Sequence, residues 1–125
     1  MPAHILLVED DLFLRELYAQ ALESSGFKVT AVADAQAALD ALDSRPADAI
    51  VLDVFLPVNN AFAVIQQLQS YGDWQALPVI LISSHRLTRQ QLPAKLKRQL
   101  SVVDFLYKPD ILPDGVVSSV KAALQ

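Results

Sequence analysis

Short apolar runs alternate with stretches of helical periodicity from one end of the chain to the other, and this alternation constrains the fold more than any other feature. Five runs have the length and the β-branched or fully apolar character of strands. They are residues 5–8, 28–33, 49–53, 78–83 and 102–107. Strands that alternate with helices build a parallel sheet with helices on both of its faces. The sequence therefore predicts an α/β fold with a five-stranded parallel sheet.

The stretches between these runs predict the helices. Apolar residues recur at helical spacing after the first strand until Gly26 stops them, and Asp34 can cap a helix after the second strand. Further helices are expected after the third strand and after Pro113. Between the fourth and fifth strands Pro93 interrupts the pattern, so a broken or shifted helix is expected there.

Length and composition limit the organisation of the chain. With 125 residues, of which 53% are hydrophobic and 19% charged, residues 1–125 suit a single domain whose sheet is buried on both faces. The absence of cysteine excludes disulfides and thiolate metal sites. No apolar stretch approaches the roughly 20 residues that span a bilayer, so no membrane partner is expected and the cytoplasm is the expected location. A net charge of −4 argues against nucleic acid as a direct partner.

Polar residues gather where the predicted strands end, which is where an open parallel sheet binds its ligands. These residues are Glu9-Asp10-Asp11, Asp53, Ser83-Ser84 and Tyr107-Lys108-Pro109. An acidic, oxygen-only cluster calls for a hard cation, and Mg²⁺ suits it because that ion keeps positions for phosphate oxygens. Asp53 is the natural nucleophile toward a phosphoryl group. Lys108 and the Ser83 hydroxyl would then contact the phosphoryl oxygens.

These motifs resemble the receiver domain of response regulators in bacterial two-component signalling, and the resemblance covers essentially all 125 residues. Each motif alone is common, but the matches occur in the family's order at the predicted strand ends. The corresponding positions are the acidic pair Glu9 and Asp10, the phospho-accepting Asp53 in Asp53-Val54-Phe55-Leu56-Pro57, the hydroxyl residue Ser83, the aromatic Phe105 and the pair Lys108-Pro109.

The resemblance implies a flavodoxin-like strand order of 2-1-3-4-5 and a single receiver domain with no output domain in this chain. It implies that Mg²⁺ is bound by Glu9, Asp10, Asp53 and the main-chain carbonyl of Phe55. Asp53 would accept the phosphoryl group from a sensor histidine kinase or a phosphotransfer protein, with Lys108 and Ser83 assisting. Ser83 and Phe105 would act as switch residues.

By the same resemblance, the chain is a signalling switch rather than an enzyme, catalysing only its own phosphoryl transfer and dephosphorylation. Its downstream partner would be a target protein or an output domain outside this chain.

Three departures from the family pattern leave an alternative open. Ala61 stands where the family usually has glycine, Phe55 places a large apolar side chain two residues after Asp53, and Pro93 makes the segment before the fifth strand unusual. They motivate a degenerate receiver that acts as a constitutive protein-interaction module. Two enzyme classes fit less well. A phosphatase with an aspartate nucleophile should have a second aspartate at the position of Phe55. A flavin protein should have a Gly- or Ser-rich loop at the position of Glu9 and Asp10.

Several polar residues have two interpretations. Asp11 is either a third acid of the site or the N-cap of the first helix, the interpretation we favour. One irregular segment holds half of the ten basic residues, namely Arg86, Arg89, Lys95, Lys97 and Arg98. It is either a solvated helix face or a docking surface for an acidic partner or a nucleic acid backbone. His4 and His85 are interpreted as structural or surface residues.

Overall fold

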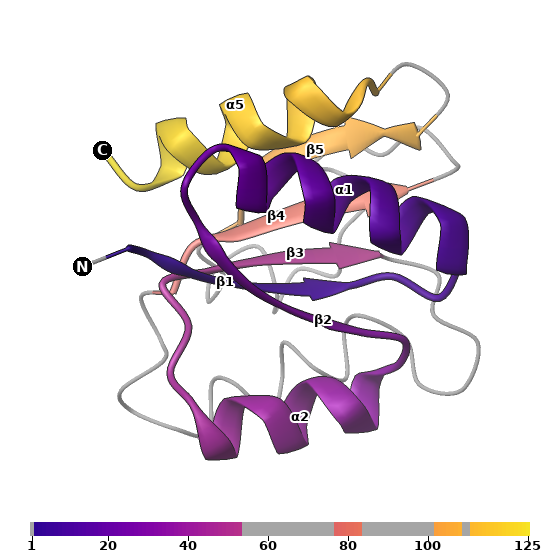
Figure 1. Ribbon diagram of the computed structural model, residues 1–125, viewed down its shortest axis with the longest axis vertical. Helices are drawn as coiled ribbons and strands as arrows, with labels where there is room; N and C mark the ends of the chain where they lie inside the picture. Colours follow the sequence, from indigo (N-terminus) through magenta and orange to yellow (C-terminus); the bar gives the residue numbers. More distant parts are fainter. Residues whose placement is uncertain (1, 54–76, 84–101, 109–110) are drawn as a thin grey trace.

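A five-stranded parallel sheet forms the centre of the protein (Figure 1), in a computed structural model that describes residues 2–53, 77–83, 102–108 and 111–125. The strands are β1 (His4–Val8), β2 (Lys28–Val32), β3 (Ala49–Asp53), β4 (Val79–Ser83) and β5 (Val102–Tyr107). Every adjacent pair is parallel, and the order across the sheet is β2-β1-β3-β4-β5. The predicted fold class and strand order are confirmed.

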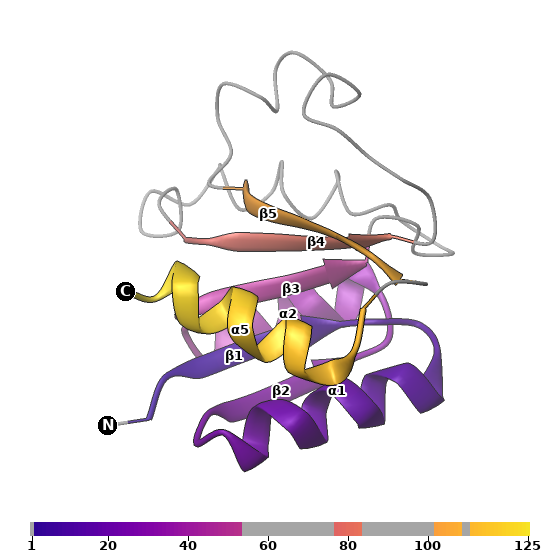
Figure 2. The ribbon, with the colours of Figure 1, turned by 90° about the horizontal axis from the view of Figure 1, so that it is seen from above.

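The helices of the described residues cover both faces of this sheet. They are α1 (Leu12–Ser24), α2 (Ala35–Ser44) and α5 (Pro113–Ala123). Helix α2 lies on one face, and α1 and α5 lie together on the other (Figures 1 and 2). None of the described helices combines the length and the apolar character that a membrane span requires. The helix predicted after β3 and the broken helix around Pro93 lie outside the described residues.

The predicted ends of α1 and α2 are confirmed in detail. Asp34 caps α2, because its side chain accepts a hydrogen bond of 2.8 Å from the main-chain N–H of Ala37. Gly26 follows the end of α1 with φ at +97°, a conformation that costs glycine little and other residues more. The reversal at Gly26 returns the chain into β2.

The core consists of two layers separated by the sheet. Side chains at alternate positions of β1, β3 and β4 pack with α2, and the intervening ones pack with α1 and α5. Every side chain of these three strands is buried, which explains why they are continuous apolar runs in the sequence. The alternation places Asp53 on the α1 and α5 side, since Val51 two residues earlier packs there.

An irregularity in the pairing of β4 with β5 sets the end of β5. Val79 pairs with Val102, but the next residue, Ile80, pairs with Asp104, so β5 contains one extra residue at this point. The pairing then continues to Ser83 opposite Tyr107. Lys108 follows directly, at the same edge of the sheet as the end of β3.

The acidic residues and the two chain termini lie at opposite edges of the sheet. The strands point toward the edge where the acidic residues lie, while both chain termini lie at the opposite edge (Figure 1). His4 belongs to that opposite edge and is buried, with Nδ1 donating to the carbonyl of Pro46 at 2.7 Å and Nε2 hydrogen-bonded to the Thr30 hydroxyl at 2.7 Å. Its predicted structural role is confirmed, and His85 lies outside the described residues.

Candidate functional site

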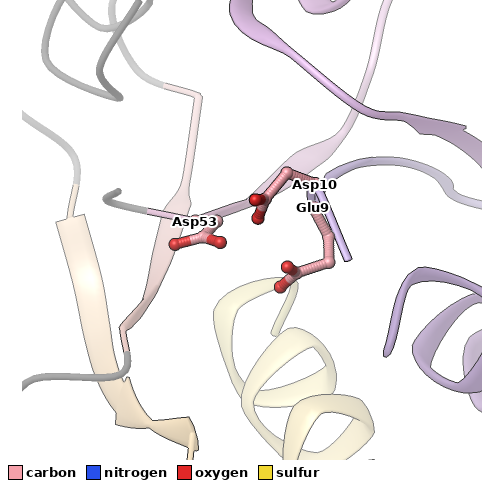
Figure 3. A group of neighbouring side chains, drawn as sticks. All are labelled: Glu9, Asp10 and Asp53. Atoms are coloured by element: carbon pink, nitrogen blue, oxygen red, sulfur yellow. The ribbon is translucent and has the colours of Figure 1, made fainter. Parts of the chain in front are cut away.

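Three carboxylates meet at the carboxyl ends of β1 and β3. Glu9 and Asp10 follow β1 and Asp53 ends β3, and the two strands are direct neighbours in the sheet. One carboxylate oxygen from each residue lies within 4.8 Å of the others, and Figure 3 shows the three side chains converging. Glu9 is 0% exposed and Asp53 is 2% exposed, whereas Asp10 faces solvent. The predicted grouping of these acids is therefore present in the structure.

Lys108 connects two of these acids. Its Nζ donates to Asp53 Oδ2 at 2.8 Å and to Glu9 Oε1 at 3.0 Å, and its side chain is only 16% exposed. Burial alone would lower the pKa of Lys108, but its hydrogen bonds to Asp53 and Glu9 outweigh that effect and raise the pKa above its usual value. The ammonium therefore stays charged next to the carboxylate of Asp53.

The two carboxylate oxygens of Glu9 have different surroundings. Its Oε1 accepts from Lys108 and, at 3.1 Å, from the main-chain N–H of Asp11, whereas its Oε2 is buried without a hydrogen-bond partner among the described residues. Burial, together with the negative charge of Asp53, raises the pKa of Glu9 to about 7. A buried carboxylate oxygen without a partner is costly, so this atom calls for a further ligand.

Asp10 ionises more readily than Glu9. Burial works against its ionised form, but hydrogen bonds with the side chains of Asp53 and Glu9 lower the pKa of Asp10 below its usual value. The cluster therefore combines an acid that ionises easily with one that holds its proton.

These residues fit a bound Mg²⁺. The donors are all oxygens, they lie close enough to share one ion, and Glu9 Oε2 has lone pairs that no described residue uses. Oxygen-only coordination with few protein ligands is what Mg²⁺ prefers, and a divalent cation would relieve the repulsion among the acids. The main-chain carbonyl of Phe55, predicted as another ligand, lies outside the described residues.

Ser83 lies at the same edge as the acids. It is buried at the end of β4, where its neighbour Ile82 pairs with Asp53 of β3 and Ser83 itself pairs with Tyr107 of β5. The structure thus places Ser83 on the strand between those that carry Asp53 and Lys108. Its role toward a phosphoryl group stays a prediction.

Several predicted features cannot be placed, because they fall outside the described residues or side chains. They are Ala61, Ser84, Pro109, the side chain of Phe105, and the basic residues Arg86, Arg89, Lys95, Lys97 and Arg98.

Asp11 caps α1. Its Oδ1 accepts a 2.9 Å hydrogen bond from the main-chain N–H of Leu14, and Asp11 is not among the three acids whose oxygens converge. The interpretation of Asp11 as an N-cap is therefore confirmed.

Replacement of this cap should affect stability but not cation binding. Asp11→Ala should lower the free energy of unfolding by about 1 kcal/mol because an N–H of the first turn loses its acceptor. Asp11→Ser should retain most of the stability, since serine also caps helices. Urea denaturation measures the stability and calorimetric Mg²⁺ titration the affinity. A large loss of Mg²⁺ affinity in Asp11→Ser would instead show that Asp11 is a ligand.

Sequence reasoning missed two features near the acids. Arg15 of α1 donates from Nη1 to the main-chain carbonyl of Glu9 at 3.0 Å. Leu12 and Phe13, also in α1, are exposed although they are large and apolar. The sequence does contain a signal for Arg15, namely an arginine one helical turn after the N-cap Asp11.

Comparisons with known proteins agree with the motif resemblance. A family model described as "Response regulator receiver domain" matches residues 5–116. The regulatory protein VirG of Agrobacterium tumefaciens is 35% identical over 106 residues, covering 85% of this chain and 38% of that protein. The response regulator MprA of Mycolicibacterium vanbaalenii is 31% identical over 125 residues, covering 100% of this chain and 52% of that protein.

A solved structure is similar in fold. The chemotaxis response regulator CheY4 of Vibrio cholerae has a TM-score of 0.87 at 21% identity, and the likeness covers 99% of this chain and 100% of that chain. The chain spans about half the length, or less, of the two curated relatives named above.

Proposed function

Because this chain belongs to the receiver domain family of response regulators, which act in two-component signalling, we propose that it is a switch that accepts a phosphoryl group on Asp53. One observation carries the proposal: Lys108 Nζ lies 2.8 Å from Asp53 Oδ2, beside two further acids that can bind a hard cation. A nucleophile, a fixed positive charge and cation ligands thus lie together at the carboxyl ends of β1 and β3.

Each side chain has a chemical role in the transfer. An oxygen of the Asp53 carboxylate attacks the phosphorus of a phosphohistidine donor, the phosphorus–nitrogen bond breaks, and the departing imidazole takes up a proton. Lys108 provides positive charge for the phosphoryl oxygens, and Ser83 provides a hydroxyl donor. Glu9, Asp10 and Asp53 would hold Mg²⁺, which supplies further charge neutralisation at those oxygens. Transfer from Asp53 to water would end the signal.

Phosphorylation would act as a switch through the added charge. A phosphoryl group brings three acceptor oxygens and between one and two negative charges to a site where Lys108 is already bound to acids. Lys108 and Ser83 would then rearrange toward the phosphoryl oxygens, with Phe105 responding. Converting a mostly inactive population into a mostly active one requires the phosphate to favour the active state by about 5 kcal/mol.

The donor is proposed to be a sensor histidine kinase or a phosphotransfer protein in the cytoplasm. A protein donor must cover the rim of the site to bring its histidine to Asp53. Phe13 and Leu12 at the start of α1 and Leu112 just before α5 lie at this rim, with Phe13 72% and Leu112 73% exposed. Large apolar side chains at solvent-facing positions mark interaction sites. The downstream partner would be a target protein or an output domain beyond this chain.

Phe13→Ala should separate docking of the donor from the chemistry. Transfer from a histidine kinase that phosphorylates the wild type should slow by about tenfold, the size expected when an apolar interface residue is truncated. Phosphorylation by a small-molecule phosphodonor should be unchanged, because the Phe13 side chain faces solvent and has no chemical role in the transfer. Glu23→Ala, exposed at the far end of α1, is the matched control. Equal slowing with both donors would contradict a docking role.

The degenerate interaction module is not supported. The acids, the hydroxyl residue and the lysine are all present at one edge of the sheet, and the family match extends over the whole set up to residue 116.

The direct test of the proposed function is incubation of the protein with a small-molecule phosphodonor, with and without Mg²⁺, followed by mass spectrometry. A Mg²⁺-dependent phosphoryl adduct on the peptide that contains Asp53 supports the proposal. Absence of an adduct under all conditions would return the interaction module as the better explanation.

A further inference from the structure

Arg15 holds the main chain of the acidic turn between β1 and α1. Its Nη1 donates to the carbonyl of Glu9 at 3.0 Å, and the N–H of Glu9 donates to the carbonyl of Val32 in β2 at 3.0 Å. The main chain of Glu9 is therefore held from both directions, by α1 through its carbonyl and by β2 through its N–H. Arg15 itself is half-buried.

The position of this carbonyl explains why a side-chain donor is needed. The ladder of β1 with β2 and with β3 ends at Val8, so Glu9 lies one residue beyond the last paired position. A carbonyl at a strand end still requires a donor when it is shielded from water. Arg15 provides that donor from one helical turn beyond the N-cap Asp11.

The same carbonyl belongs to the peptide unit that joins Glu9 to Asp10. A peptide unit is planar, so when its two Cα atoms are held by the chain, the direction of the C=O fixes how the plane of the unit is turned about the line between them. The directions in which the two acidic side chains leave the main chain depend on that plane. A guanidinium anchored in α1 can therefore control how these carboxylates face Asp53.

We infer that Arg15 is a positioning residue for cation binding, acting through the peptide unit between Glu9 and Asp10. The inference rests on the proposed Mg²⁺ site and adds to it a residue that contacts neither the cation nor the phosphoryl group. The hydrogen bond of Arg15 is to a main-chain carbonyl, so Arg15 acts through the geometry of the main chain.

Replacement of Arg15 tests the inference with a binding measurement. Arg15→Met keeps the apolar stem but removes the donor, and its affinity for Mg²⁺, measured by calorimetric titration of the full chain, should fall by about tenfold, the loss typical of residues that orient metal ligands. Arg15→Lys keeps a donor and should recover most of the affinity. Arg45→Met removes an exposed arginine at the end of α2 and serves as the matched control.

The outcomes are distinguishable. A merely structural role predicts that Arg15→Met lowers the melting temperature but leaves the Mg²⁺ affinity unchanged, and that result would overturn the inference. A wild type that binds no Mg²⁺ would refute the proposed cation site itself. If Arg15→Met does not fold, Arg15→Gln replaces it as the test variant. Glutamine is a shorter, neutral donor and cannot reach the carbonyl of Glu9 in the same geometry. Unchanged Mg²⁺ affinity in Arg15→Gln would equally overturn the inference.

Discussion

An Asp53→Asn variant should acquire no phosphoryl group from a small-molecule phosphodonor in the presence of Mg²⁺, while the wild type becomes phosphorylated. An amide oxygen is a poor nucleophile and cannot form the acyl phosphate, so the loss should be at least about 10³-fold. Intact-mass spectrometry of both proteins, incubated side by side, measures it. The variant should still fold, because Lys108 retains its hydrogen bond to Glu9.

Asp43→Asn is the matched control for this substitution. Asp43 is exposed on α2, so its replacement removes the same charge far from the site and should leave phosphorylation unchanged. A phosphoryl adduct of wild-type yield on Asp53→Asn would contradict Asp53 as the acceptor. Peptide mapping would then identify which other residue accepts the group, with Asp10 the first to inspect because it lies in the same cluster.

The second large expected effect is a dependence of the unfolding free energy on pH in the absence of divalent cations. The pKa of Glu9 is raised from 4.5 to about 7 in the folded protein, so folding is favoured by the protonated form. This contribution is fully present below about pH 4.5 and is lost as the pH rises through about 7. A shift of this size corresponds to about 3 kcal/mol of unfolding free energy.

Comparison with Glu9→Gln isolates the contribution of this one carboxyl. Well above pH 7 the variant should be more stable than the wild type by about 3 kcal/mol, because glutamine has no charge to bury. At pH 4.5 the two proteins should be similar in stability. Urea denaturation at both pH values, in the presence of a chelator, provides the measurement. Equal pH dependence of the two proteins would show that Glu9 is not the group that titrates.

Mg²⁺ should reverse the order of stability of the wild type and Glu9→Gln above pH 7. A ligand that binds only the folded state stabilises it in proportion to its affinity, and carboxylate ligands must be ionised to bind a cation. The wild type should therefore gain stability from Mg²⁺ above pH 7, whereas Glu9→Gln, with one ligand fewer, should gain less.

The sequence was sufficient to predict the central strands of the sheet, because strands that are buried on both faces are continuous apolar runs. The buried strands β1, β3 and β4 are runs without polar interruption, and each prediction differs from the observed bounds by at most one residue. The acids were predictable for a related reason. Where the chain leaves a buried strand, the first polar residues lie at the sheet edge, so the sequence pattern alone placed Glu9 and Asp53 together.

Other features of the site depend on distances that a linear pattern does not contain. The extra residue in β5 beside Val79 sets where Lys108 lies, but the run 102–107, in which Asp104 is the one charged residue, does not by itself show where the pairing shifts. The bridge from Lys108 to both Glu9 and Asp53 joins residues up to 99 positions apart. The spacing of Arg15 from the N-cap Asp11 can be read from the sequence, but the sequence does not show that the guanidinium contacts the main-chain carbonyl of Glu9.

The location of the two termini has a practical consequence for experiments and for the evolution of longer proteins. Both ends lie at the edge of the sheet away from the acids (Figure 1), and a strand of five residues spans about 16 Å. A purification tag or a fluorescent protein can therefore be fused at either end without crowding the approach to Asp53. A module that senses the proposed phosphorylation of Asp53 from its point of attachment would have to respond to a change in the shape of the domain, since that point lies about one strand length from Asp53.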